Sequence, residues 1–293
     1  MKELSLSSEY KTMINGCVHG GVSYLQEHPN IKSLIIGISG GVDSAVIAAL
    51  ARQIANHMAA IDNREIKVCG YSLNIEGNKS DEIKRAKAVG HAYCDIFVEE
   101  NLSDTFWLML GRGIDPALYA KCRSGHTLAA AEKIRMGNMK ARIRMVYLYD
   151  KAQEQNGLVL STDNLTEYNL GFWTLHGDVG DFGLIQNLWK TEVYGMGDII
   201  GGPVTDCVRA IPTDGLGITN SDIDQLLPDW TSEKGDHRAA YKLIDEILIG
   251  HLSELGTFSS ENPVIQRYEA TRFKRKNPVS IKRDMLLWSF NSL

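Results

Sequence analysis

The sequence contains no apolar run long enough to cross a membrane: no stretch approaches the roughly 18 uncharged residues of a spanning helix. Its N-terminal segment also lacks the apolar core of a secretory signal. Cysteine is scarce, and no two cysteines are spaced as C-x-x-C, which argues against a disulfide framework or a zinc site. These absences predict a cytoplasmic protein with reduced thiols and no membrane partner. The cysteines are Cys17, Cys69, Cys94, Cys122 and Cys207.

Internal repeats, low-complexity tracts and Pro- or Ser-rich linkers are also absent. A chain of 293 residues can bury a full hydrophobic core, so one domain over residues 1–293 is the simplest prediction. The net charge of -5 argues against a dedicated nucleic-acid-binding protein, because such proteins carry an excess of basic residues. We therefore expect no nucleic-acid partner.

Short apolar runs alternate with helical patterns along the chain. Buried strands are predicted at 33–39, 65–74, 94–100 and 157–163. Helices are predicted before Pro29 and at 43–58, 79–92 and about 127–155. This alternation predicts an α/β fold, a doubly wound parallel sheet with helices on both faces. Ligands of such sheets bind beyond the carboxyl ends of the strands, so we expect Gly40 and Thr162, which both follow a strand, to face one crevice.

The turn after the first predicted strand fits two motifs. "GISGG", residues 37–41, matches G-x-S-x-G, the nucleophile elbow of α/β-hydrolases, and would make Ser39 a nucleophile. "HGG" at 19–21 is similar to the oxyanion element of lipases. However, only one predicted strand precedes Ser39, whereas a nucleophile elbow follows a central strand, and 19–21 falls in a helical pattern. A serine hydrolase is therefore the weaker interpretation.

The second motif, "SGGVDS" at 39–44, matches a phosphate-binding loop. Gly40 and Gly41 allow a tight turn whose N–H groups approach a ligand, and the N-terminus of the next helix favours anions. A Walker A loop is excluded because no G-K-[ST] follows. Asp43 would repel phosphates unless a cation lies between them, so it implies Mg²⁺ and a carboxylate that is unpaired until the metal arrives. The alternative is an ordinary turn in which Asp43 caps the helix.

This loop resembles that of the N-type ATP pyrophosphatases, and further segments resemble one group of them, the NAD synthetase family. The segments follow the family's order and are "GISGGVDS" (37–44), "GNMKARIRM" (137–145), "STDNLTEYNLGFWTLHGD" (161–178), "LWKTEVY" (188–194), "IPTDGLGIT" (211–219) and "FKRKNP" (273–278). The resemblance implies an adenine nucleotide alpha hydrolase-like fold. It also implies a ligase that amidates deamido-NAD with ammonia and ATP through an acyl-adenylate, releasing AMP and pyrophosphate. A homodimer with the dinucleotide at its interface is implied as well.

The resemblance assigns a role to each matching residue. ATP would be bound by Gly37, Ile38, Ser39, Gly40, Gly41, Val42, Asp43, Ser44, Thr162, Lys190 and Thr213. Mg²⁺ would be held by Asp43 and Glu167, and deamido-NAD by Arg142, Asp181 and Lys274. No residue would be a covalent nucleophile, so Ser39 would only donate hydrogen bonds.

Some of these residues also have plainer interpretations. Thr162 can be a helix cap, Glu167 an exposed helix charge and Lys190 a solvated surface lysine. Arg142 and Arg144 lie about 200° apart on a helix, so both cannot face one ligand. The resemblance selects Arg142, which leaves Arg144 for a structural ion pair.

The chain departs from the family pattern near the dinucleotide site. Leu175 stands where some members have a lysine, and Phe273 replaces the histidine before Lys274. The segment before Asp181 is one residue shorter than usual, and the loop after Thr213 is nearly deleted. The departures therefore fall on the segments that would contact the dinucleotide.

Other functions remain open. Other adenylating ATP pyrophosphatases, such as tRNA-thiolating or GMP synthetase-like enzymes, share the loop, but the thiolating enzymes need paired catalytic cysteines and a basic RNA surface. A non-catalytic nucleotide-binding regulator would not need both Asp43 and Glu167. A glutaminase domain of about 250 residues does not fit in this chain, so free ammonia is the expected nitrogen donor.

Overall fold

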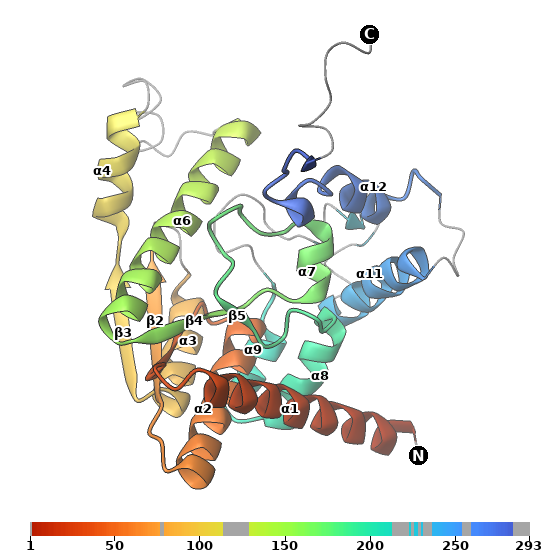
Figure 1. The fold of residues 1–293 in the computed structure, drawn as a ribbon. Helices are drawn as coiled ribbons and strands as arrows, with labels where there is room; N and C mark the ends of the chain where they lie inside the picture. Colours follow the sequence, from red (N-terminus) through yellow and green to blue (C-terminus); the bar gives the residue numbers. More distant parts are fainter. Residues whose placement is uncertain are drawn as a thin grey trace.

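The computed structural model describes residues 2–76, 79–113, 129–212, 236–253 and 259–283, together with the single residues 223, 226, 227 and 230. Its sheet has five strands in the order β3-β2-β1-β4-β5, and every pair is parallel (Figure 1). The strands are β1 (Ser33–Gly37), β2 (Lys67–Asn74), β3 (Ile96–Asn101), β4 (Gly157–Ser161) and β5 (Phe182–Gly183). The predicted α/β class and its parallel sheet are confirmed.

Helices lie on both sides of this sheet (Figure 1). They are α1 (Lys2–Glu27), α2 (Val42–Asp62), α3 (Ser80–Tyr93), α4 (Ser103–Gly113), α6 (Ala130–Glu154), α7 (Leu165–Leu170), α8 (Lys190–Ile200), α9 (Val204–Arg209), α11 (His237–Leu252) and α12 (Pro263–Ala270), with the 3-10 turn η2 (Lys274–Lys276). The predicted helices are present with shifted ends. Among the described residues, none of the helices has both the length and the apolar character to cross a membrane.

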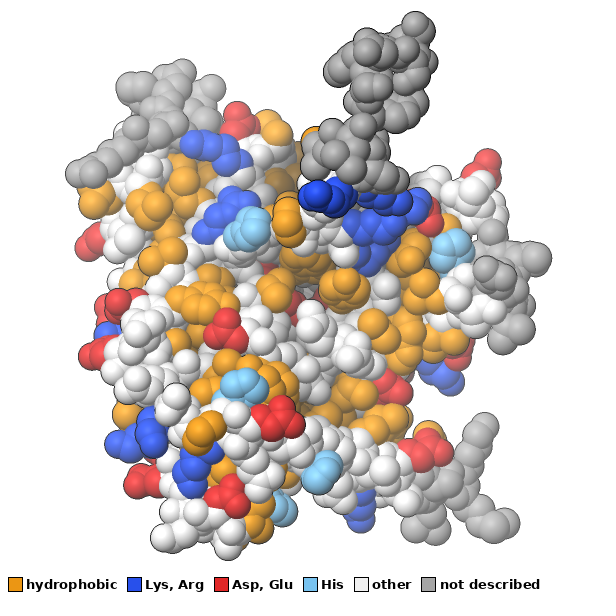
Figure 2. Space-filling model, viewed as in Figure 1, with side chains coloured by type: hydrophobic (Ala, Val, Ile, Leu, Met, Phe, Trp, Pro, Cys, Tyr) orange, Lys and Arg blue, Asp and Glu red, His pale blue; other side chains and the backbone are white. Residues whose placement is uncertain are grey.

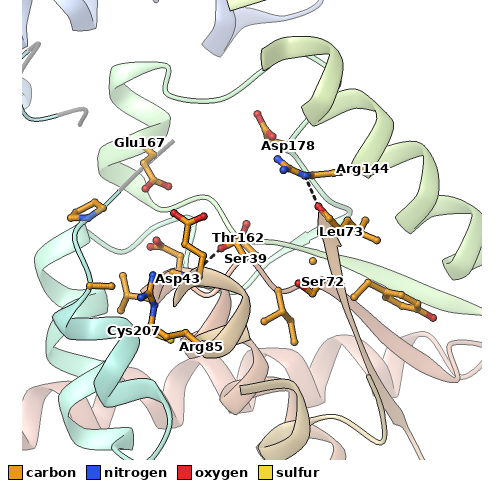
Figure 3. Close-up of a pocket in the computed structure, with 18 of the residues that line it drawn as sticks. Ser39, Asp43, Ser72, Leu73, Arg85, Arg144, Thr162, Glu167, Asp178 and Cys207 are labelled. Carbon is orange, nitrogen blue, oxygen red and sulfur yellow. Dashed lines mark hydrogen bonds between the residues drawn. The ribbon is translucent and has the colours of Figure 1, made fainter. Parts of the chain in front are cut away.

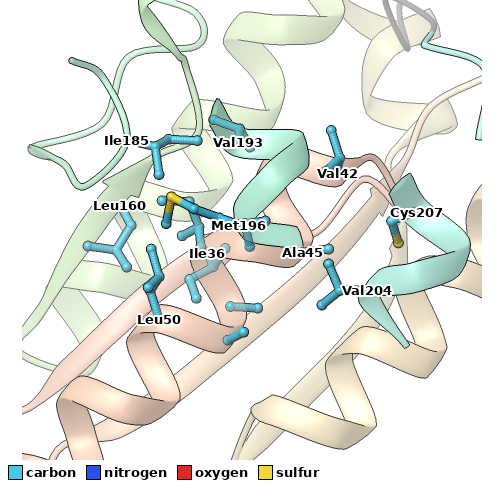
Figure 4. Packing of buried hydrophobic residues seen from close by; sticks show 14 of the residues in the cluster. Ile36, Val42, Ala45, Leu50, Leu160, Ile185, Val193, Met196, Val204 and Cys207 are labelled. Atoms are coloured by element: carbon cyan, nitrogen blue, oxygen red, sulfur yellow. The ribbon is translucent and has the colours of Figure 1, made fainter. Parts of the chain in front are cut away.

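Alternate residues of β1 enter two hydrophobic cores. Leu34 and Ile36 pack with α1, α2 and α8 in the larger core, part of which Figure 4 shows around Ile36 and Met196. Ile35 faces the opposite side of the sheet and packs in the core that α4 and α6 cover. Burial on both faces explains why the strand is a continuous apolar run rather than an alternating one.

The strand order places the ligand crevice. β1 pairs with β2 on one side and β4 on the other, so the chain leaves the centre of the sheet in opposite directions. Such a switch point opens a crevice beyond the carboxyl ends of the two central strands. The loop after Gly37 and the residues after Ser161 therefore meet at one edge of the sheet.

Candidate active site

The loop between β1 and α2 is shaped by its own hydrogen bonds. The Gly41 N–H donates to Ser39 Oγ (3.2 Å), the Ser44 hydroxyl donates to the Gly41 carbonyl (3.2 Å), and the two hydroxyls lie 3.2 Å apart. Gly40 has a φ of 82°, and a Cβ there would lie 2.3 Å from the carbonyl oxygen of Glu82. Only glycine fits between the loop and α3. The result is a tight turn at the N-terminus of α2, where anions are favoured.

Among the described residues, Ser39 has no partner that would activate it as a nucleophile. Within the described part of the chain, its hydroxyl is hydrogen-bonded to Gly41 and Ser44 and to no histidine. Residues 19–21 lie inside α1 and not in an oxyanion loop. The hydrolase interpretation is therefore wrong.

A cavity of about 260 Å³ opens beyond the carboxyl ends of β1, β2 and β4 (Figure 3). The predicted ATP and metal residues that line it are Gly37, Ile38, Ser39, Gly41, Val42, Asp43, Thr162, Glu167 and Lys190. Gly40 belongs to the same loop, and Ser44 lies in the first turn of α2. Thr213 lies outside the described residues, so its role stays a prediction. The fold thus gathers at one cavity residues that are far apart in the sequence, such as Asp43 and Lys190, which are 147 positions apart.

Within this cavity the ammonium of Lys190 lies between two carboxylates. Its Nζ is 2.5 Å from Asp43 Oδ2 and 2.8 Å from Glu167 Oε1. The lysine side chain is 4% exposed, and the carboxylate side chains are 16% and 19% exposed. Burial alone would lower the pKa of Lys190, but the two carboxylates hold that pKa well above its ordinary value. A solvated Lys190 and a fully exposed Glu167 are therefore excluded.

Neighbouring side chains hold this cluster in place. Asn164 donates to Asp43 Oδ1 (2.9 Å), and its own Oδ1 accepts the Glu167 N–H (3.0 Å) at the start of α7. Asp245 of α11 accepts hydrogen bonds from Thr166 in α7 and from the first turn of α8. α7, which carries Glu167, and α8, which carries Lys190, are thereby both tied to one buried aspartate.

The helix-cap interpretations are also wrong. Gly41 is the N-cap of α2 and has no side-chain cap, so Asp43 does not cap that helix. Asn164, not Thr162, caps α7. The Asp43 carboxylate is not unpaired either, because it contacts both Lys190 and Asn164. It shares the single positive charge of Lys190 with Glu167.

The donor set suits a hard cation that is shared with a ligand. Asp43 and Glu167 converge on one atom, Lys190 Nζ, and both keep some exposure to the cavity. Among the described residues, no group of three or more His, Cys, Asp or Glu side chains can hold a metal. A Mg²⁺ completed by ligand oxygens and water fits the two carboxylates.

Comparison with known proteins identifies the family. A family model described as NAD synthase matches residues 14–278, most of the chain. The chain belongs to the NAD synthase family. The resemblance that its motifs predict is confirmed.

Named relatives and solved structures agree with this membership. The NH(3)-dependent NAD(+) synthetase of Thermoplasma acidophilum is 29% identical over 258 residues, 86% of this chain and 91% of the relative. That of Mesoplasma florum is 33% identical over 252 residues, 84% and 91%. The structure of NMN synthetase from Francisella tularensis has a TM-score of 0.72 at 23% identity, covering 93% of this chain and 98% of that one. NH3-dependent NAD synthetase from Campylobacter jejuni gives 0.61 at 18%, with 93% and 99% covered. The two structures share the fold.

The two arginines of this family's α6 motif point in different directions. Arg142 is exposed, and its Nε donates to the Leu175 carbonyl (3.2 Å). Arg144 lines the cavity, and its Nε donates to the Leu73 carbonyl (3.0 Å; Figure 3). Burial raises the pKa of Asp178, and the nearby Arg144 opposes that rise. The structure therefore brings Arg144 to the cavity, and the contact predicted for Arg142 stays a prediction.

The Asp181 carboxylate accepts hydrogen bonds from other parts of the protein. Its Oδ1 accepts the Tyr149 hydroxyl (3.0 Å), and its Oδ2 accepts the N–H of Val159 within β4 (3.1 Å). The side chain is not part of the cavity lining. Its predicted contact with a dinucleotide stays untested.

Lys274, also outside the cavity lining, belongs to a basic cluster that secures the end of α7. Figure 2 shows Lys and Arg side chains gathered over this part of the molecule. Lys274, Arg267 and Arg275 donate to carbonyls at and just beyond the C-terminus of α7. The acceptors are Asn169, Leu170, Gly171 and Trp173. The basic segment therefore helps to position α7, which carries Glu167.

Several residues that line the cavity were not predicted from the sequence. Ser72 and Leu73 end β2, Asp178 precedes β5, and Arg85 lies on α3. The signal for the first two was present, because the carboxyl end of a predicted strand lies at the same edge as the loop. Arg85 had no such signal, since it stands in the middle of an ordinary amphipathic helix.

Proposed function

We propose that this chain converts the nicotinate carboxylate of deamido-NAD into the amide of NAD, with ATP and ammonia as co-substrates. The observation that carries the proposal is the cavity in which a glycine-rich loop at a helix N-terminus faces Lys190 between Asp43 and Glu167. Membership in the NAD synthase family supports it.

The chemistry follows from the need for a leaving group. A carboxylate does not expel oxide, so its oxygen attacks the α-phosphorus of ATP, the bond to the β-phosphate breaks and pyrophosphate leaves. Ammonia then attacks the acyl carbon of the adenylate, and AMP leaves. The protein supplies positioning and stabilisation of charge, not a nucleophile. The N–H groups of residues 40–44 would hold the pyrophosphoryl end of ATP.

We also propose that Asp43 and Glu167 hold Mg²⁺ together with ATP oxygens and water. When bound, the cation would neutralise phosphate charge that the acidic cluster otherwise repels. Lys190 keeps the two carboxylates close together, and its ammonium lies where phosphate oxygens can reach it. A metal shared with the nucleotide agrees with the lack of a third acidic ligand among the described residues.

A second candidate substrate is the mononucleotide acid that corresponds to NMN. Arg142, Asp181 and Lys274 do not line the cavity, and Leu175 stands where some members of the family have a lysine. The residues expected to bind the second nucleotide therefore lie outside the cavity that the loop and Lys190 share. One solved structure with the same fold is an NMN synthetase.

The direct test is incubation with ATP, Mg²⁺ and ammonium and with either deamido-NAD or the mononucleotide acid. We expect one amide product by mass, with AMP and pyrophosphate formed only when the nucleotide acid is present. Glutamine should be far poorer than ammonium as a nitrogen donor. Release of ADP and phosphate, or equal rates with glutamine, would contradict the proposal.

We further propose that the chain forms a homodimer. Three large side chains on α6 are exposed, Ile134 (47%), Val146 (72%) and Tyr149 (40%), and burying them would be favourable. The family resemblance implies a dinucleotide bound at such an interface, which supports the proposal. A cytoplasmic location and a single domain over residues 1–293 stay predictions from the sequence.

Replacing Ser39 with alanine should weaken amide formation by about 10²-fold without abolishing it, because one preorganised hydroxyl is lost from the loop. Turnover of Ser39→Ala is compared with that of Ser253→Ala, whose hydroxyl lies at the exposed end of α11. Complete loss, together with covalent labelling of Ser39 by an acylating probe, would restore the nucleophile interpretation.

A further inference from the structure

Arg85 on α3 is a cation at the phosphate-binding loop that no motif of the sequence indicated. Its Nε donates to the carbonyl of Gly40 (2.9 Å), and the side chain lines the cavity beside the loop (Figure 3). The loop and α3 are in close contact there, since a Cβ on Gly40 would collide with the Glu82 carbonyl. The guanidinium is thus anchored at one nitrogen against the turn itself.

The rest of this guanidinium is available to a ligand. In the described chain Arg85 has no carboxylate within 4 Å and no other hydrogen-bond partner than Gly40. Neither terminal nitrogen is a buried atom that lacks a hydrogen-bond partner. Among the described residues, such an atom is found only in Arg64, at Nε. Lys190 differs, since two carboxylates already neutralise it. Arg85 therefore offers a free planar fork, the geometry that binds two phosphate oxygens at once.

We propose that Arg85 binds the pyrophosphoryl end of ATP and stabilises the pyrophosphate as it leaves. This inference rests on the proposed function. As the bond between the α-phosphorus and its bridging oxygen breaks, negative charge accumulates on the departing pyrophosphate. Preorganised donors aimed at developing charge lower the barrier. The bond from Nε to Gly40 holds the fork in place before ATP arrives.

A purely structural role, in which Arg85 only ties α3 to the loop, makes a different prediction. It would affect every ligand of the cavity and the stability of the fold together. Binding of inorganic pyrophosphate and of AMP separates the two roles, since only pyrophosphate presents the group that Arg85 would contact. Neither measurement requires turnover, so the result does not depend on which nucleotide acid the enzyme amidates.

The experiment is calorimetric titration of Arg85→Gln, Arg85→Lys and the full wild-type chain with pyrophosphate and with AMP, each with Mg²⁺. Lys84→Gln is the matched control, because it removes the same charge from an exposed position on the same helix. We expect Arg85→Gln to weaken pyrophosphate binding about 10–100-fold and AMP binding less than twofold. Arg85→Lys, which keeps the charge without the fork, should lie between.

Equal losses for AMP and pyrophosphate, or no loss in either Arg85 variant, would overturn the assignment. If Arg85→Gln fails to fold, the ratio of the two affinities in Arg85→Lys decides. If Arg85→Gln selectively loses pyrophosphate binding but the wild-type chain forms no amide, the assignment of Arg85 stands. That result would count against the proposed function alone.

Discussion

Replacing Lys190 with methionine is expected to lower amide formation by at least about 10³-fold and to lower the melting temperature. Methionine keeps an unbranched side chain as far as Cε and removes the ammonium between Asp43 and Glu167. Two carboxylates would then face each other and the triphosphate without the ammonium that now lies between them. Removing one partner of a buried ion pair costs about 3–5 kcal/mol, and the lower end applies here because both carboxylates are partly exposed.

The same variant should respond more strongly to Mg²⁺. Without Lys190, two unpaired carboxylates form a stronger cation site, so Mg²⁺ alone should raise the melting temperature of Lys190→Met more than that of the wild type. Thermal denaturation with and without Mg²⁺ measures this, and Lys242→Met is the control on an exposed face of α11. Wild-type turnover in Lys190→Met would remove the lysine from the active site.

The fold could be predicted from the sequence because its central strands are buried on both faces. Residues 33–37 and 157–161 are continuous apolar runs followed by polar residues, and the first leads into a long helix. The strand ends are harder to predict. The predicted strands continue to residues 39 and 163, whereas β1 ends at Gly37 and β4 at Ser161, where the ligand loops begin. β5 was not predicted, since two residues carry no period.

The site could be predicted only in part. The loop after β1 has a local signature, whereas the contact of Asp43 with Lys190 joins residues 147 positions apart and depends on how α8 packs against α2. The pattern therefore indicated two acidic residues but not the lysine between them. This is also why Asp43 was expected to lack a partner.

Helical spacing alone could not decide between the arginines of α6. It correctly separated Arg142 from Arg144 by direction, but which side faces the cavity depends on the sheet that α6 covers. β2 lies beneath it and offers the Leu73 carbonyl to Arg144. Asp181 was similarly ambiguous, because an aspartate beside an edge strand can serve either a ligand or a backbone N–H.

Asp43→Asn and Glu167→Gln are each expected to lower turnover by about 10²–10³-fold while the fold is retained. Each change keeps the shape of the side chain and one oxygen, so Asn164 can still donate to position 43, and Lys190 keeps one carboxylate in either variant. Stability should fall modestly in both. This differs from the expectation for an unpaired Asp43, whose removal would have raised the melting temperature.

The metal proposal is tested by the dependence of turnover on Mg²⁺ concentration. If the two carboxylates hold Mg²⁺ against ATP, both variants should need a higher Mg²⁺ concentration for half-maximal rate, and excess Mg²⁺ should recover part of the activity. Glu154→Gln, on the exposed end of α6, is the matched control and should behave as the wild type. If the two carboxylates only position Lys190, turnover would fall, but the Mg²⁺ concentration for half-maximal rate, the midpoint, would not change. An unchanged midpoint in either variant would therefore remove that residue from the proposed metal site and leave it only as a partner of Lys190.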